Sequence, residues 1–172
     1  MPDGLNATQG SLLGFLADGP KTGWDLLAEV EGGLARFWNV TASHVYRELR
    51  TLEERGLLTA GEPGIRDRRP FSITAAGEEA FRAWIAQEPG PEQIRFPLLV
   101  TLWFGRHLDP DVRSGFLESS RKDHEARLSM YEAITPPDPH TGAVIAFGIA
   151  YETAILGWLK SLDQLPVTSS PQ

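Results

Sequence analysis

Side chains that could recognise DNA are concentrated in residues 41–56, TASHVYRELRTLEERG. Ser43, His44 and Arg47 would lie on the first two exposed turns of a helix, where hydroxyl, imidazole and guanidinium groups can contact bases or phosphates. The alternative for these three residues is an ordinary solvated helix surface. We expect Arg47 to contact a guanine edge or a phosphate, because a guanidinium can donate two hydrogen bonds to either.

The same segment has the apolar pattern of a helix that packs on a core. Val45, Leu49 and Leu52 recur at i, i+4 and i+7, so they share the face opposite the polar one. Thr41 is a good N-cap residue and is also a candidate DNA contact. Tyr46 lies between the two faces, and its hydroxyl could reach a phosphate while its ring packs. A helix of this kind is what a helix-turn-helix motif places in a major groove.

Arginines recur in the turn that follows this helix. Residues 57–59 and 71–73 are predicted strands, and Glu62 to Arg69 form a turn that contains Gly, Pro and Arg. The order of helix, strand, basic turn and strand predicts a β wing. Its cationic side chains could contact phosphates or a narrow minor groove, and they are Arg66, Arg68 and Arg69. Asp67 could instead pair with one of them, and Lys21 is a further phosphate candidate.

The charge distribution limits the kind of nucleic-acid binding that the chain can support. The net charge is −7, which disfavours non-specific binding because phosphate contacts need Lys and Arg. Residues 36–70 nevertheless contain seven arginines against five acidic residues. A small basic patch on an acidic body predicts that affinity depends on a few positioned contacts and on dimerisation.

Composition argues against several other functions. The chain has no cysteine, which excludes disulfides, thiolate metal sites and cysteine nucleophiles. Its four histidines lack metal-ligand spacing, and no P-loop or dinucleotide fingerprint is present. We therefore predict no enzyme activity, no metal and no cofactor. The sequence shows no signal-peptide pattern and no apolar run near the roughly 20 residues that span a bilayer, so we predict a cytoplasmic protein without membrane contact.

The elements that must position the recognition helix can be placed along the chain. A first helix is predicted from Thr8 to the stop at Asp18-Gly19-Pro20, and Thr22 caps a second helix from Gly23 to Glu31. The predicted inward residues of the second helix are Trp24, Leu27 and Val30. Aromatic residues in the turn before the recognition helix, Phe37 and Trp38, are expected to pin that turn to the core.

A fourth helix and a hinge complete the predicted DNA-binding half. Thr74 caps a helix from Ala75 to about Gln87, whose expected inward residues are Phe81, Trp84 and Ile85. Glu88-Pro89-Gly90-Pro91 is the clearest helix-breaking segment in the sequence, and we interpret it as a hinge between two halves of the chain. We predict a winged helix-turn-helix domain over residues 1–88, a helical dimerisation and effector domain over 89–166, and a flexible tail over 167–172.

The second half is predicted to contain three helices. Pro97 suits the first position of a short helix that extends to His107, and Asp109-Pro110 starts a long helix to about residue 134. Pro136, Pro137 and Pro139 are expected to break that helix. Thr141 is expected to open a final helix that ends near Gln164.

The final helix has a seam of apolar residues spaced alternately by three and four. The members of this seam are Val144, Phe147, Tyr151, Ile155, Trp158 and Leu162. A second apolar stripe lies beside it, and one partner helix cannot cover so wide an arc. We therefore predict a homodimer that uses this helix, with a core helix of a single chain as the alternative.

Aromatic residues of the second half could form an effector pocket, because planar hydrophobic compounds stack on such side chains. The candidates are Phe96, Trp103, Phe104, Phe147, Tyr151 and Trp158. Plain core or interface packing is the alternative for each. Glu152 lies in an apolar stretch and could be a polar anchor or an exposed charge.

These segments together resemble the PadR family of winged-helix transcriptional regulators over nearly the whole chain. The segments that carry the resemblance are LLGFLADGPKTGWDLL (12–27), FWNVTASHVYRELRTLEERGLL (37–58), RDRRPFSITAAGEEAFRAWI (66–85) and FGIAYETAILGWL (147–159). The resemblance implies a mainly α fold with a small β wing, in which a winged helix-turn-helix precedes an all-helical dimerisation domain. It also implies a dimeric DNA-binding repressor that a small hydrophobic or aromatic effector releases from its operator.

Two departures from the family pattern concern candidate contacts. Thr22-Gly23-Trp24 stands where the family often has His-Gly-Tyr, and Pro70-Phe71 stands where a Tyr often follows Lys or Val. The second departure removes a hydroxyl, so the wing would depend more on its arginines. The length of the second half resembles the larger branch that contains virulence and stress regulators. Competing functions are a winged-helix protein-interaction module without DNA binding and a ligand-binding carrier.

Overall fold

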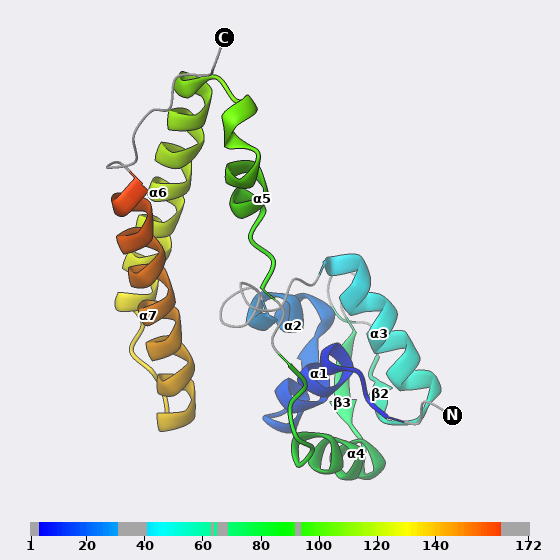
Figure 1. Cartoon of the computed structure of the whole chain (residues 1–172). Helices are drawn as coiled ribbons and strands as arrows, with labels where there is room; N and C mark the ends of the chain where they lie inside the picture. Colours follow the sequence, from blue (N-terminus) through cyan, green and yellow to red (C-terminus); the bar gives the residue numbers. More distant parts are fainter. Residues whose placement is uncertain (1–3, 31–40, 63, 65–68, 92–93, 163–172) are drawn as a thin grey trace. The chain divides into compact units, whose positions relative to one another are not determined.

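The computed structural model describes residues 4–30, 41–62, 64, 69–91 and 94–162. The chain forms two compact units, residues 1–91 and 92–172 (Figure 1). The first unit contains α1 (Ala7–Ala17), β1 (Lys21–Thr22), α2 (Gly23–Glu29), α3 (Ala42–Glu54), β2 (Leu58–Ala60), β3 (Pro70–Ile73) and α4 (Ala75–Ile85). The second unit contains α5 (Pro97–Trp103), the 3-10 helix η3 (Gly105–His107), α6 (Pro110–Glu132) and α7 (Pro139–Leu162).

The strands of the first unit form a three-stranded antiparallel sheet in the order β1-β3-β2. Thr59 pairs with Ser72 in the β2–β3 hairpin, and Lys21 pairs with Phe71 across the other edge of β3. The hairpin confirms the predicted wing strands. The sequence did not indicate β1, because two residues are too short to show an alternating pattern. Lys21 therefore lies in a strand rather than at the start of a helix.

The core of the first unit lies between α1, α2, α3 and the sheet. Its fully or nearly fully buried residues are Leu12, Leu13, Leu16, Leu26, Val45, Leu49, Leu52, Leu57 and Leu58. Three of them, Val45, Leu49 and Leu52, form the apolar face that was predicted for the recognition helix, and this prediction is confirmed. Burying each such side chain contributes about 1.5–3 kcal/mol, so this stripe holds α3 on the rest of the unit.

Side-chain caps start the helices of the first unit where the sequence indicated. The hydroxyls of Thr22, Thr41 and Thr74 each accept a hydrogen bond from a backbone N–H in the first turn of the helix that follows. The cap of α1 is Asn6, whose side chain forms a reciprocal capping box with Gln9.

Two large apolar residues that were expected inside are exposed. Trp24 is 54% exposed and Ile85 is 62% exposed, so both predictions are wrong. Of the other inward residues predicted for this helix, Val30 is buried at its C-cap, and Leu27 is half-buried against the core, as expected. Leu26 is also fully buried, so the buried face of α2 is rotated away from Trp24. Phe37 and Trp38 lie outside the described residues.

Phe81 and Trp84 of α4 are half-buried and pack on glycines of α1. A Cβ on Gly10 would come within 2.4 Å of the Trp84 ring, and one on Gly14 would come within 3.0 Å of the Phe81 ring. The absence of side chains at these two positions therefore allows the aromatic rings of α4 to approach the α1 backbone closely.

The second unit is built on α6 and α7, which run side by side (Figure 1). They are antiparallel, since His124 contacts Glu152 while Tyr131, further along α6, packs on Gly148, earlier in α7. Asp109 caps α6 as predicted. The start of α7 differs from the prediction, because Pro139 opens this helix and does not only break the preceding one. Pro is favourable in the first turn, where its missing N–H is not needed.

The fully buried face of α7 is narrow. It consists of Gly148, Glu152 and Leu159, whereas Val144 and Phe147 of the seam are 41% and 56% exposed. By its length and its mean hydropathy of 1.5, α7 could cross a membrane. The sequence prediction of no such segment considered only uninterrupted apolar runs, and the apolar residues of α7 are interrupted by polar ones. The length and hydropathy of α7 are weak evidence of a span, since buried ion pairs of Glu152 join α7 to α6.

We predict that Gly77→Ala destabilises the first unit. An added Cβ would lie 2.0 Å from the backbone oxygen of Leu57, so the start of α4 would have to move away from β2. This overpacking should cost about 3 kcal/mol, which exceeds the gain of about 1 kcal/mol from replacing Gly in a helix. Urea unfolding followed by circular dichroism measures the change. Gly90→Ala, whose Cβ meets nothing within 4 Å, is the control and should change stability by less than about 0.5 kcal/mol.

Candidate nucleic-acid interface

The N-terminal turns of α3 present the side chains that the sequence singled out. Thr41 Oγ1 accepts a hydrogen bond from the His44 backbone N–H at 3.3 Å and lies 3.1 Å from Ser43 Oγ. Ser43 is exposed, the His44 side chain is 34% exposed, and the Arg47 side chain is 67% exposed. These four residues thus form one polar surface, in which Thr41 caps the helix and most of the Arg47 side chain is exposed to solvent.

A buried carboxylate lies beneath this polar surface. Glu48 is 7% exposed, and its Oε2 accepts hydrogen bonds from Gln9 Nε2 at 2.8 Å and from Asn6 Nδ2 at 3.2 Å. Its Oε1 lies 3.0 Å from His44 Nε2 and accepts from Arg47 Nη2 at 3.4 Å. A carboxylate with four partners is satisfied despite its burial. Sequence reasoning missed Glu48, although its place beside Leu49 and one turn after His44 was a signal for it.

These partners lower the pKa of Glu48 below its usual value of 4.5. Burial acts most strongly and raises the pKa, since it disfavours the charged form. The hydrogen bonds from Gln9 and Asn6, together with the nearby His44 and Arg47, outweigh burial and favour the carboxylate. The ionised form of Glu48 is therefore part of the folded structure.

Gln9 extends the contact between α1 and α3 to a second point. Its side-chain oxygen accepts hydrogen bonds from Arg55 Nη1 at 3.2 Å and from the Asn6 backbone N–H at 3.2 Å. Glu48 and Arg55 lie two turns apart on α3, and both contact this one glutamine. The recognition helix is thus joined to α1 by polar contacts along the edge of its apolar stripe.

Tyr46 packs its ring on the start of α2. A Cβ on Gly23 would come within 2.5 Å of the ring, and Tyr46 is nevertheless 48% exposed. This matches the expectation that its ring packs, and its hydroxyl stays a candidate for phosphate contact.

The other cationic candidates differ in their surroundings. Lys21 Nζ lies 2.9 Å from Glu29 Oε1, and this hydrogen bond raises the lysine pKa despite the opposing effect of burial. The Lys21 ammonium group is therefore in an ion pair with Glu29 in this structure. Arg69 is exposed next to β3. Arg66 and Arg68 lie outside the described residues.

Four of the six aromatic residues proposed for an effector pocket form two ring pairs within the second unit. Phe96 makes edge contacts with Trp158 and with His124, at centroid distances of 5.7 and 5.8 Å. The ring centroids of Phe147 and Tyr151, on the same helix, are 6.3 Å apart. Trp103 and Phe104 are 78% and 53% exposed.

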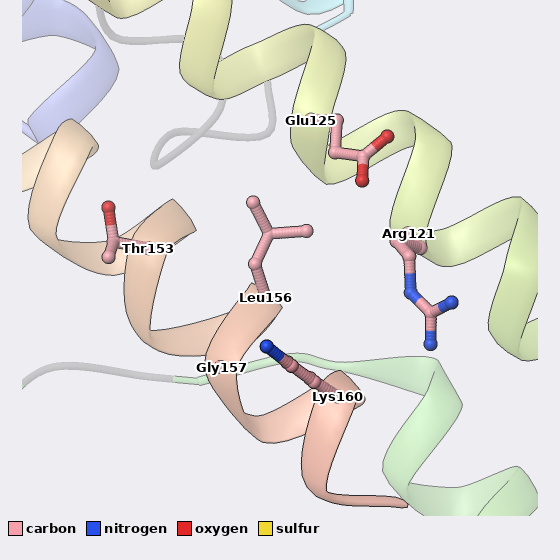
Figure 2. A pocket seen from close by; sticks show the side chains of 6 residues that line it. All are labelled: Arg121, Glu125, Thr153, Leu156, Gly157 and Lys160. Atoms are coloured by element: carbon pink, nitrogen blue, oxygen red, sulfur yellow. The ribbon is translucent and has the colours of Figure 1, made fainter. Parts of the chain in front are cut away.

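A hollow of about 510 Å³ lies between α6 and α7 and uses none of those aromatics. Figure 2 shows Arg121 and Glu125 on α6 and Leu156 and Lys160 on α7 around it. Thr153 and Gly157 complete its lining. Its lining includes two cations and one acid, although most of the lining surface is apolar.

The structure also answers the open question about Glu152. This residue is 3% exposed, its Oε2 contacts His124 Nδ1, and its Oε1 accepts a hydrogen bond from Arg127 Nε at 3.0 Å. Glu152 is therefore a buried polar anchor between α7 and α6. Among the residues that the structure describes, no cluster of His, Asp or Glu could hold a metal ion.

The first unit has the element order and the antiparallel wing of a winged helix-turn-helix, in which α3 occupies the place of the recognition helix. Comparison with protein families agrees with this class. The model of the transcriptional regulator PadR-like family matches residues 12–83, and the model of the virulence activator alpha C-terminal domain matches residues 94–165. The chain thus carries a PadR-like domain followed by a virulence activator alpha C-terminal domain.

Individual relatives share this organisation. The negative transcriptional regulator PadR of Bacillus subtilis is 23% identical over an alignment of 169 positions that covers 88% of this chain and 93% of the relative. Its structure with operator DNA covers 91% of this chain and 97% of its own, with a TM-score of 0.74 and 21% identity. Its complex with p-coumaric acid covers 91% and 96%, with a TM-score of 0.68 and 21% identity.

A further solved structure has the same fold over most of the chain. The virulence activator AphA of Vibrio cholerae covers 90% of this chain and 95% of its own, with a TM-score of 0.68 and 19% identity. At such identities the structural likeness shows a common fold.

We predict that Glu48 makes folding stability depend on pH in the acidic range. Because its pKa is lowered by folding, its stabilising effect is fully present above the unfolded value of about 4.5 and is lost as the pH falls through the folded value. Glu48→Gln should therefore be less stable than the wild type at pH 7, and this difference should shrink below pH 4.5. Urea unfolding at several pH values measures it. Glu54→Gln, at an exposed position of α3, should change stability by less than about 0.5 kcal/mol, and a Glu48→Gln difference that did not vary with pH would contradict the prediction.

Proposed function

We propose that this protein is a sequence-specific DNA-binding repressor that acts in the cytoplasm as a homodimer, with α3 as its recognition helix. The observation that carries the proposal is the surface of α3, which exposes Ser43 and Arg47 while Val45, Leu49 and Leu52 anchor the opposite face. The B. subtilis relative is a negative regulator, which supports repression, and its structure has been solved with operator DNA, which supports DNA binding.

The proposed binding mode follows from the geometry of helix-turn-helix dimers. Two copies of α3 would enter successive major grooves of a pseudo-palindrome, about 34 Å apart. Ser43, His44 and Arg47 would contact base edges or phosphates, and Tyr46 and Lys21 would contact phosphates. The wing arginines Arg66, Arg68 and Arg69 would add phosphate or minor-groove contacts.

Exposed apolar side chains of the second unit support the proposed dimer. Val144 and Phe147 begin the seam of α7, and α5 exposes Leu99, Val100 and Trp103 by 47%, 62% and 78%. Exposed apolar patches are typical of protein–protein interfaces, and we propose that these side chains contribute to one. We propose that the seam, which continues through Tyr151, Ile155, Trp158 and Leu162, packs against a second copy of the chain.

We further propose that a small hydrophobic or aromatic effector binds in the helical domain and releases the repressor from DNA. The p-coumaric acid complex of the B. subtilis relative supports this class of ligand. Phe96 and Trp158 form one aromatic pair that could line such a site, and Phe147 and Tyr151 form another. A shift of a few ångströms between the two recognition helices would be enough to lose one half-site, because the spacing of the grooves is fixed.

We predict that Arg47→Ala and Arg68→Ala weaken DNA binding in different ways. Loss of a base contact by Arg47 should reduce affinity for the operator by about 1–3 kcal/mol and relax specificity at one position. Loss of a phosphate contact by Arg68 should weaken all duplexes similarly and reduce the slope of log affinity against log salt by about 1. Fluorescence anisotropy at several salt concentrations, with DNA from upstream of the protein's own gene, measures both effects.

The same assay separates the proposed function from its competitor. If the wild type showed no salt-dependent binding to this DNA or to any duplex selected from a random pool, a protein-interaction module would be the better assignment. If both variants bound like the wild type, the assignment of the DNA-binding face would be wrong.

We predict that Phe147→Glu dissociates the dimer. The side chain is 56% exposed within one chain, so a charge there is compatible with the folded monomer but not with an apolar interface. Analytical ultracentrifugation at micromolar concentration should show a dimer for the wild type and the 19.0 kDa monomer for the variant. The control is Ala146→Glu, at an exposed position around the helix from the seam, and it should stay dimeric. A monomeric wild type would contradict the proposed dimer.

A further inference from the structure

The two oxygens of the Glu48 carboxylate contact different parts of the first unit. Oε2 accepts hydrogen bonds from Gln9 and Asn6 at the start of α1, whereas Oε1 lies within 3.4 Å of nitrogen atoms of both His44 and Arg47. One carboxylate thus joins the folded framework of α1 to two candidate DNA contacts on the surface of α3.

The contacts of Glu48 Oε2 with the start of α1 are held in place by burial and by further hydrogen bonds. Glu48 and Gln9 are 7% and 6% exposed, and Gln9 also contacts Arg55 near the end of α3. Rotation of the carboxylate would leave buried polar atoms without partners, which is costly in a protein interior. The position of Oε1 relative to α3 is therefore set by the packing of α1 and α3.

We propose that Glu48 is a positioning residue that determines the DNA sequence specificity of α3 by orienting His44 and Arg47. This inference rests on the proposed DNA-binding function. A long side chain that is already oriented loses less conformational freedom when it contacts its cognate base. The negative charge of Glu48 also weakens the attraction of Arg47 to phosphates, and phosphates are the main ligands at non-cognate sites. Both effects increase the ratio of cognate to non-cognate affinity.

The first test measures this specificity ratio. The cognate probe is the duplex that wild-type protein selects most strongly from a random pool, and the non-cognate probe is a scrambled duplex of the same composition. Anisotropy titrations should show that Glu48→Gln lowers the ratio of affinities about tenfold, as expected for one well-formed base contact. Glu53→Gln removes the same charge from an exposed position of the same helix, and its ratio should stay within about twofold of the wild type.

A double-mutant cycle distinguishes positioning from a general effect on the fold. In a His44→Ala/Arg47→Ala background, Glu48→Gln should change cognate affinity by no more than about twofold, because the residues that it orients are absent. A loss of the same size in both backgrounds would overturn the inference, since Glu48 would then act only through the packing of α3. Glu48→Leu provides a second uncharged variant that suits a buried site, and it should lower the ratio as Glu48→Gln does. The affinities of all variants are compared at a temperature and pH at which circular dichroism shows every variant to be folded.

The outcomes separate this inference from the proposed function. A wild-type protein that binds no duplex would overturn both. A wild-type protein that discriminates between the two probes, together with an unchanged ratio in Glu48→Gln and Glu48→Leu, would overturn only the role of Glu48.

Discussion

The packing of α3 against α1 is the contact on which the candidate DNA surface depends. Val45, Leu49 and Leu52 are almost completely buried, and they leave only one face of α3 available to solvent. Any rotation of the helix that exposed a different face would also expose this stripe, at a cost of about 1.5–3 kcal/mol for each side chain. The direction in which Ser43 and Arg47 point is therefore decided by hydrophobic burial on the other side of the helix.

Polar contacts refine what apolar burial determines. An apolar stripe allows small adjustments, because its contacts are not directional. The hydrogen bonds from Gln9 and Asn6 to Glu48, and from Arg55 to Gln9, are directional and hold two points of α3. This combination gives the candidate DNA surface of α3 a defined geometry.

In the second unit, too, a buried carboxylate joins two helices beside apolar contacts, but one of those helices keeps much of its apolar surface exposed. Glu152 is buried on α7 and is paired with His124 and Arg127 of α6, so the two helices are joined by charge as well as by Leu159 and Gly148. Because the buried face of α7 is narrow, much of its apolar surface remains at the surface of one chain. Phe147 of the seam is accordingly more than half exposed within one chain, which is the basis of the proposed contact with a second copy.

The sequence by itself determined the caps at Thr22, Thr41 and Thr74, the apolar stripe of α3, the wing strands and the PadR-like domain, because these depend on local spacing and residue type. The tertiary structure alone decided that Trp24 is exposed while Leu26 is buried, and that the two residues of β1 form a strand. It also decided that Glu48 and Glu152 are buried. A carboxylate is placed inside only when distant residues supply its partners, and Gln9 and Glu48 are 39 positions apart. Such long-range pairings follow from how the helices pack, whereas the local spacing could indicate only the contact between His44 and Glu48.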